Sequence, residues 1–330
     1  MSSSNRATEP ASGVTTGISQ KGLRAGAVGV LGAVVIGVST IAPAYTLTAS
    51  LGPTVAVVGT QVPAIILVGF IPMLLTAFGY RELNRMMPDS GTSFTWGVRA
   101  FGPWIGWMTG WGLIAATVIV LSNLAGIAVE FLFLLIAQLS GNPEIADLAF
   151  NPIINVVVCL LFMLGATLVS YRDMQTTQKF QYILVGFQVL VLVIFATVAI
   201  VKAVSGDAPE PTAFSWSWFN PFEVPSFSAF AAGLSLSIFI FWGWDVVLTM
   251  NEETKDPEKT PGRAAMVTVV VVVSLYLLLA IGLIMFAGVG TGDYGLANED
   301  ISANVFFALS DPILGPLAFL VSLAVLSSSA

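Results

Sequence analysis

The chain has 330 residues, of which 56% are hydrophobic and only 9% are charged, and its formal net charge is −7. A soluble domain carries roughly 25% charged residues and a nucleic-acid-binding protein needs a basic face, so both classes are excluded. The chain has no histidine and a single cysteine, Cys159, which excludes disulfide frameworks, thiolate metal sites and histidine-based catalysis, and we expect no cofactor.

The apolar residues are gathered in long blocks, and a helix needs about 20 such residues to cross the hydrocarbon core of a bilayer. Because the blocks are continuously apolar rather than alternating, they predict helices and not the strands of a β-barrel. We therefore expect an all-α, polytopic membrane protein. Its eight predicted spans lie at about 25–50, 54–80, 101–137, 152–171, 180–204, 226–250, 264–289 and 312–330.

The basic residues are distributed unequally between the two sides of these spans. On this assignment every lysine and arginine except Lys202 lies on one side. Cytoplasmic loops carry the excess of basic residues, so this side, with the N-terminus, is predicted to be cytoplasmic. The loops on the other side carry acidic residues, namely Glu144, Asp147, Asp207, Glu210, Glu223, Asp293, Glu299 and Asp300.

The two ends of the chain differ in composition. Residues 1–24 are rich in Ser, Thr and Gly and have no apolar core, which is typical of a flexible cytoplasmic tail and not of a cleaved signal peptide. Residues 327–330 lie inside an apolar segment that has no polar flank. We expect the chain to be a fragment of a longer membrane protein, and a natural terminus at the far face of the membrane is the alternative.

The first span is predicted to be interrupted near its middle. A glycine, two hydroxyl residues and a proline lie close together there, namely Gly37, Ser39, Thr40 and Pro43. A proline has no N–H and clashes with the preceding turn, and a glycine costs about 1 kcal/mol relative to alanine in a helix. Non-helical backbone persists at membrane depth only where it lines a protein-buried or water-filled cavity. An ordinary kink, with the hydroxyl groups bonded back to the helix, is the alternative.

The sixth span contains a second candidate interruption. Gly243 lies between Trp242 and Trp244, and Asp245 follows. A carboxylate at this depth costs at least about 2.5 kcal/mol unless it is paired or hydrated, so we expect Asp245 to be functional. The alternative is a structural carboxylate that caps a half-helix or bonds freed backbone amides.

Spans one and six are five spans apart, and discontinuous helices in corresponding positions of two inverted halves are typical of the substrate site of a secondary transporter. The N-terminus of a half-helix offers free amides and a positive dipole end to a carboxylate, while free carbonyl groups accept from an ammonium group. A zwitterionic amino acid carries both groups.

Glu130 is an acidic residue toward the outer part of the third span. Such a residue is a candidate for a proton relay or for pairing with the amine of a substrate. The alternative, which we favour, is an acid near the outer headgroups or bonded to a neighbouring span. Asn123, one or two turns earlier, could share either role.

Four segments match the pattern of a known family. They are GVST at 37–40, PDSGTSFTW at 88–96, FWGWD at 241–245 and NEETKDPEKTP at 251–261. On these segments the chain resembles an amino acid permease of the amino acid–polyamine–organocation (APC) superfamily, over nearly its whole length. The resemblance implies a leucine-transporter-like fold with two inverted repeats of five helices. Residues 25–204 would form the first repeat, and residues 226–330 would begin the second, which would be truncated within the eighth span.

The resemblance also implies how a substrate is held. Backbone amides around Val38, Ser39 and Thr40, next to Gly37, would bind its carboxylate. Carbonyl groups near Phe239 and Ile240 would accept from its amino group.

Further roles in gating and coupling follow from the same resemblance. Trp242 or Trp244, beside Gly243, would close over the substrate side chain, and Asp245 matches a glutamate that is implicated in substrate release or proton response.

Two other positions bear on whether protons or sodium are the coupling ion. In the fifth span Gln188 stands where relatives often have a lysine in place of sodium, so a lysine-based proton switch is not expected. Ser327 and Ser328 could offer oxygen ligands to sodium, although hydroxyl residues in spans more often serve packing.

These features predict a secondary active transporter that moves amino acids across the plasma membrane of a bacterium by alternating access. Proton-coupled symport is our first choice and exchange the second, with an amine or polyamine permease of the same fold as the alternative. A channel or an intramembrane enzyme is less favoured, because the sequence shows neither symmetric rings of ligands nor a catalytic constellation.

Overall fold

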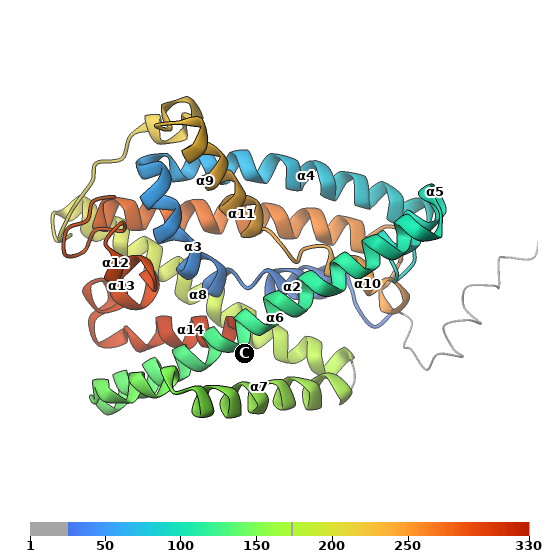
Figure 1. Cartoon of the computed structure of the whole chain (residues 1–330), viewed down its shortest axis with the longest axis horizontal. Helices are drawn as coiled ribbons and strands as arrows, with labels where there is room; N and C mark the ends of the chain where they lie inside the picture. Colours follow the sequence, from blue (N-terminus) through green and yellow to red (C-terminus); the bar gives the residue numbers. More distant parts are fainter. Residues whose placement is uncertain (1–25, 173, 330) are drawn as a thin grey trace, which may run out of the picture.

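The computed structural model describes residues 26–172 and 174–329, so the expected tail at 1–24 lies outside the described residues. Every regular element in the described part is a helix, apart from one isolated bridge between Val28 and Thr254. The long helices run along the longest axis of the molecule (Figure 1). The prediction of an all-α protein is confirmed.

The helices follow one another along the chain with short 3-10 turns, denoted η, between some of them. The first half of the chain forms α2 (Val30–Ile41), α3 (Pro43–Val58), η1 (Gly59–Gln61), α4 (Val62–Met86), α5 (Ser93–Phe101), α6 (Pro103–Ser140), η2 (Pro143–Phe150), α7 (Pro152–Arg172) and α8 (Met174–Ser205). The second half forms η3 (Trp216–Phe219), η4 (Pro221–Glu223), α9 (Phe227–Phe239), α10 (Val246–Thr249), η5 (Asn251–Glu253), α11 (Thr260–Ala287), α12 (Glu299–Ser302), α13 (Val305–Leu314), η6 (Gly315–Leu317) and α14 (Phe319–Ser329).

Five helical stretches of the described residues are long and apolar enough to cross a membrane. They are Val30–Met86, Pro103–Ser140, Pro152–Val169, Gln178–Ser205 and Thr260–Ala287, and the first of them joins α2, α3, η1 and α4. Shorter apolar helices lie at Phe227–Phe239, Val305–Leu317 and Phe319–Ser329. These lengths and compositions fit a polytopic membrane protein, as the sequence predicts.

The boundary between the first two predicted spans is wrong by several residues. The sequence places it between 50 and 54, at the pair Gly52-Pro53, but α3 continues through this pair to Val58. The helix ends instead at Gly59, whose φ of 62° is unfavourable for other residues and whose N–H bonds to Val55 O. In this span a proline therefore marks a helix end less reliably than a glycine with positive φ.

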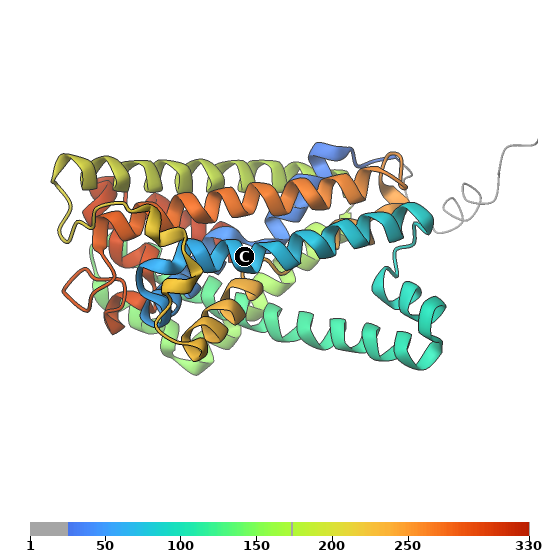
Figure 2. The same cartoon turned by 90° about the horizontal axis from the view of Figure 1, so that it is seen from above.

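The core of the molecule is built around α11. This helix packs against α2, α4 and α8, and Figure 2 shows α4, α8 and α11 running alongside one another. Its fully buried side chains include Tyr276, Leu279 and Phe286. By contrast, α6 crosses the other helices obliquely and α7 lies at the edge of the molecule (Figure 1).

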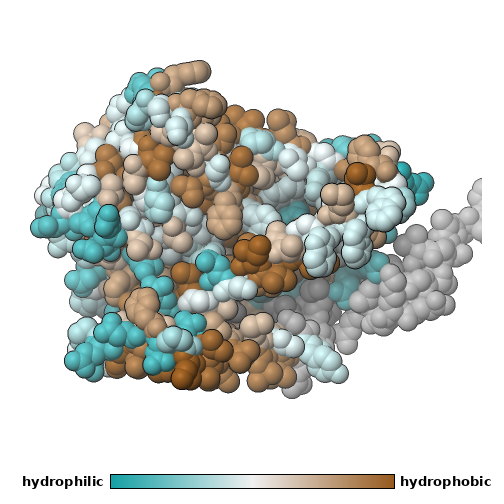
Figure 3. Space-filling view, in the orientation of Figure 1, coloured by the Kyte–Doolittle hydropathy of each residue, from teal (hydrophilic) through white to brown (hydrophobic). Residues whose placement is uncertain are grey.

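The charged residues divide the molecule into two ends. The end at the α4–α5 and α10–α11 connections carries most of the described basic residues, namely Arg81, Arg85, Arg99, Lys255, Lys259 and Arg263, together with the acidic residues Glu82, Asp89, Glu252, Glu253, Asp256 and Glu258, and we call it the basic end for its Lys and Arg content. The acidic end, at the opposite ends of the helices, carries Glu144, Asp147, Asp207, Glu210, Glu223, Asp293, Glu299 and Asp300. Hydrophilic residues gather at both ends of the view in Figure 3, and brown apolar residues cover much of the surface between them.

Candidate substrate site between two helix breaks

The first break separates α2 from α3 at a single residue. Ala42 has the left-handed φ of 54°, and its N–H bonds to the carbonyl oxygens of Val38 at 3.2 Å and Ser39 at 3.0 Å. The next residue, Pro43, has no N–H and begins α3. The backbone hydrogen bonds of α2 therefore end at Ala42, and those of α3 begin after it.

The residues GVST at 37–40 remain helical and belong to α2. The Thr40 hydroxyl donates to Ile36 O at 2.7 Å, within the same helix. Because the first residues of a helix have no intrahelical acceptor, the break leaves the amides of Ala44 and Tyr45 in α3 without one, and of these two the Tyr45 amide finds a partner in α14. The amides without an intrahelical acceptor thus lie at the start of α3, and residues 37–40 lie in the last turns of α2.

The first break is reached by two distant segments. Tyr45 N–H donates to Ser328 Oγ of α14 at 3.4 Å, and the Tyr45 hydroxyl donates to Asn123 Oδ1 of α6. The neighbouring Ser327 hydroxyl donates instead to Ala324 O at 2.8 Å, within α14. Of the two serines considered as sodium ligands, Ser328 is therefore the one that contacts the break.

The second break is longer and separates α9 from α10. Residues 240–245 form consecutive turns between Phe239 and Val246, with Gly243 at a φ of 109°. Trp242 N–H donates to Phe239 O at 3.0 Å, and Val246 N–H donates to Gly243 O at 3.3 Å. The helix that follows has only four residues.

The carbonyl group of Ile240 has a partner from the core of the molecule. The hydroxyl of Tyr276, a fully buried residue of α11, donates to Ile240 O at 2.9 Å. Sequence reasoning did not find Tyr276. The available signal is a tyrosine inside a run of Val and Leu residues, since a buried tyrosine hydroxyl usually needs a hydrogen-bond partner.

The two breaks lie against each other. A Cβ atom at Gly243 would be 2.8 Å from Thr40 O, and a Cβ atom at Gly37 would be 2.7 Å from Val247 Cγ2 of α10. Real Cβ atoms do not approach other atoms so closely, so a side chain at Gly243 would require a shift of the Thr40 backbone, and one at Gly37 a shift of the Val247 side chain. Small residues on each side therefore allow the backbones of α2 and of the 240–245 turn to meet.

The two tryptophans beside Gly243 have different surroundings. Trp244 is only 4% exposed, and its ring lies edge-on to Tyr80 of α4 with the centroids 5.3 Å apart. Tyr80 in turn makes an edge contact with Trp96 of α5 at 5.2 Å. Trp242 is half-buried. Trp244 thus belongs to an aromatic stack that extends toward the basic end.

The acidic candidates lie apart from each other in the fold. Asp245 is half-buried at the N-cap position of α10, and its side chain makes no capping hydrogen bond within the described part of the chain. Glu130 of α6 accepts a hydrogen bond from Asn304 Nδ2, in the residue that precedes α13. Asp245 therefore lies at the second break, whereas Glu130 is bonded to the α12–α13 segment near the acidic end.

Gln188 lies inside the bundle. It is 1% exposed on α8, and its Oε1 atom has no hydrogen-bond partner among the described residues. A buried amide oxygen without a donor is costly, so the position favours a bound donor group or water.

Comparison with known proteins identifies the family. A family model described as amino acid permease matches residues 28–329. The chain belongs to the amino acid permease family. The prediction made from the four sequence segments is confirmed.

Several curated relatives show the same likeness. The branched-chain amino acid permease BcaP of Lactococcus lactis is 25% identical over 232 residues, which are 67% of this chain and 46% of the relative. The low-affinity putrescine importer PlaP of Escherichia coli is 25% identical over 214 residues, 64% of this chain and 43% of the relative. The methylthioribose transporter of Bacillus subtilis is 27% identical over 255 residues, 73% of this chain and 52% of the relative.

The chain spans about half the length of the curated relatives it matches. The names of these relatives describe permeases, importers and transporters of small molecules, and not enzymes.

Proposed function

We propose that the protein is a secondary active transporter that binds a small amino acid between the two helix breaks. The carrying observation is the contact between the breaks, with Gly243 against Thr40 O. Unpaired backbone groups inside a membrane protein are tolerated where they line a buried or watery site. The names of the relatives, which include an amino acid permease, support a transport function.

The binding mode follows from the polarity of the two breaks. The N-terminal end of α3, with the amide of Ala44, would attract the substrate carboxylate, because helix N-termini favour anions. The carbonyl groups of Thr40 and Ile240, on the two sides of the contact, would accept from the ammonium group. The half-buried Trp242 would cover the side chain, while Trp244 supports the turn from behind.

Transport would proceed by alternating access in a multi-pass arrangement in the plasma membrane. The basic end would face the cytoplasm, since cytoplasmic loops carry the excess of Lys and Arg. The substrate site would then open in turn toward the basic end and the acidic end.

The proposed binding mode is tested by measuring the binding of matched compounds to the purified protein in liposomes. Binding is measured with alanine, alanine methyl ester, ethylamine and putrescine. If the site binds both the carboxylate and the ammonium group, alanine has the highest affinity. The affinities of the ester and of ethylamine are then each at least about tenfold lower, which is the loss expected for one missing charge-assisted hydrogen bond. Tighter binding of putrescine than of alanine would contradict the amino acid site and favour the polyamine alternative, for which the likeness to a putrescine importer speaks.

Proton coupling is proposed for Asp245, the acidic residue of the second break. Asp245→Asn is expected to flatten the dependence of amino acid uptake on pH while the amount of protein in the membrane stays unchanged. Asp147→Asn, at an exposed position of η2, is the matched control and leaves the pH profile as it is. A normal pH profile in Asp245→Asn would contradict the role of this carboxylate.

Sodium is the alternative coupling ion, and Ser328 is the candidate ligand because it reaches the first break. Substrate affinity measured with sodium and with choline separates the two ions. Equal affinities favour the proton, and tighter binding in sodium that is lost in Ser328→Ala but kept in Ser327→Ala favours sodium.

A further inference from the structure

The segment 214–227, which joins α8 to α9 at the acidic end, is unusually rich in aromatic residues. Its aromatic residues are Phe214, Trp216, Trp218, Phe219, Phe222 and Phe227, and its only charged residue is Glu223. We call this segment the aromatic loop. The other connections at this end carry several acidic residues, so the composition of the aromatic loop is not that of a loop in bulk water.

The aromatic loop has a defined shape. Ser215 Oγ accepts from Ser217 N–H at 3.2 Å to begin η3, and Asn220 Oδ1 accepts from Phe222 N–H at 3.1 Å to begin η4. Ser226 Oγ then accepts from Ala229 N–H at 3.1 Å and caps α9. These side-chain caps fix successive turns, so the rings are presented in set directions.

The rings fall into an inner and an outer set. Trp218 is 3% exposed and packs edge-on to Phe214, with the ring centroids 5.5 Å apart. Trp216, Phe222 and Phe227 are 79%, 93% and 84% exposed. The inner set holds the loop on the protein, and the outer set has no protein surface to cover it among the described residues.

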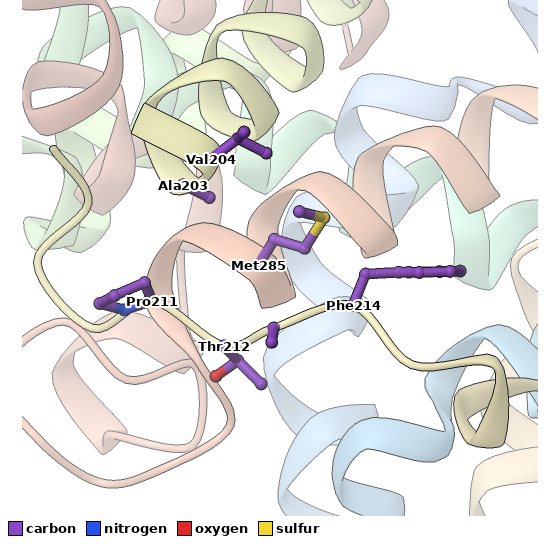
Figure 4. Close-up of a pocket in the computed structure, with 7 residues that line it drawn as sticks. Ala203, Val204, Pro211, Thr212, Phe214 and Met285 are labelled. Atoms are coloured by element: carbon purple, nitrogen blue, oxygen red, sulfur yellow. The ribbon is translucent and has the colours of Figure 1, made fainter. Parts of the chain in front are cut away.

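The start of the loop is laid down against the bundle. Residues 211–214 run past Ala203 and Val204 of α8 and Met285 of α11, and together they line a cavity of about 440 Å³ (Figure 4). The N–H of Thr212 donates to Met285 O at 3.0 Å. This contact fixes where the aromatic loop leaves the bundle.

The loop lies at the side of the bundle. Both η3 and η4 pack on α4, and in Figure 1 they project beyond α4, while other connections lie farther toward the acidic end. Farther along α4, Ile71 and Leu75 are 55% and 65% exposed, in the part of the molecule that would face lipid. The outer rings therefore belong to a loop that packs on a helix with exposed apolar side chains of its own.

We infer that the aromatic loop is a membrane-interface anchor in which Trp216, Phe222 and Phe227 enter the headgroup region of the leaflet at the acidic end. The amphipathic ring of Trp216 favours this region, and the apolar rings of Phe222 and Phe227 favour its boundary with the acyl chains. Glu223 remains at the water side, where its Oε1 accepts from Asn220 Nδ2 at 2.9 Å. Because Ser226 joins the loop directly to α9, the anchor holds the beginning of this half-helix at a fixed depth. Contact between the loop and lipid does not depend on which substrate the protein binds.

Site-directed spin labelling of the protein in lipid nanodiscs tests the anchor directly. In a Cys159→Ser background, a nitroxide is attached at Phe222→Cys, and its collisions with oxygen and with a water-soluble nickel chelate are compared. Two matched positions calibrate the result, namely Leu164→Cys on the exposed apolar face of α7 and Glu144→Cys in the exposed turn η2. We expect the label at position 222 to favour oxygen over nickel, as at 164 and unlike at 144.

Two outcomes would overturn the anchor. A label at 222 that is as accessible to nickel as the label at 144 would place the loop in water. A label shielded from both reagents would mean that a protein surface, such as a second copy of the chain, covers the rings.

Tryptophan fluorescence gives a second readout that needs no label. Lipids brominated near the headgroup are expected to quench a larger fraction of the fluorescence in the wild type than in Trp216→Phe. In Trp218→Phe, which lacks a buried tryptophan, the quenched fraction is expected to be no smaller than in the wild type. Equal quenching of Trp216→Phe and wild type would contradict insertion of Trp216.

Discussion

The two helix breaks differ in the number of residues that they take and in what interrupts the helix. The first takes a single residue, Ala42, because a proline follows that cannot donate, and helices continue on both sides. The second takes the six residues 240–245 and leaves the four-residue α10 behind it. A break made by a missing donor can be short, whereas a break made by turns around a glycine consumes more chain.

The difference extends to what supports each break. The first is reached by side chains from α6 and α14, through Asn123 and Ser328, and the second by Tyr276 from α11. The second break also depends on close backbone approach at Gly243. We therefore expect the second break to be more sensitive to a single added methyl group than the first.

The largest effect is expected for Gly243→Ala. The new Cβ would lie 2.8 Å from Thr40 O, and the φ of 109° is unfavourable for alanine, which costs about 1–3 kcal/mol for the backbone alone. We expect a lower melting temperature and loss of substrate binding, measured by thermal unfolding in detergent and by ligand binding. Gly126→Ala, where a Cβ in α6 meets no atom within 4 Å, is the matched control and is expected to unfold as the wild type does. Unchanged stability and binding in Gly243→Ala would contradict the contact between the breaks.

A smaller effect is expected for Tyr276→Phe. The substitution leaves the buried Ile240 carbonyl without its donor, which costs about 1–3 kcal/mol of unfolding free energy. Thermal unfolding measures the loss, and Tyr294→Phe, at a 37% exposed position, serves as the control with little change. Identical losses in the two variants would show that the Tyr276 hydroxyl does not support the second break.

The smallest effect is expected for Thr40→Val at the first break. The Thr40 hydroxyl is bonded within α2 to Ile36 O, so its loss is expected to cost less than about 1 kcal/mol. Substrate affinity should change little, because the proposed carboxylate donor is the amide of Ala44 at the start of α3. A large loss of affinity for amino acids, but not for amines without a carboxylate, would return the carboxylate site to residues 38–40.

Much of the architecture follows from local properties of the sequence. The long apolar blocks predict the helices because each block is long enough to cross a bilayer, and the structure has apolar helices within all of them. The Gly52-Pro53 pair misled the assignment of the first boundary, because Pro53 lies in the interior of α3, where a proline removes one hydrogen bond of the helix but here does not end it.

The details of the candidate site depend on contacts that no local pattern shows. Pro43 indicates where α3 begins, but Gly37 to Thr40 stay helical because their own amides find acceptors in α2. The partners of Tyr45 lie 78 and 283 residues away in the chain. Such pairs form only once the whole bundle is assembled, and hydrophobic periodicity carries no information about them.

The long reach of the first span has a consequence for how the protein assembles. Its start pairs with the α10–α11 connection, where Val28 N–H donates to Glu253 O at 3.1 Å and Lys255 N–H donates to Val28 O at 2.8 Å. In its middle, Tyr45 N–H donates to Ser328 Oγ at 3.4 Å, and Thr48 Oγ1 accepts from Phe306 N–H at 3.1 Å. The polar contacts of the first span therefore join it to residues that lie about 225 to 280 positions later in the chain, so they form only after those residues have been made.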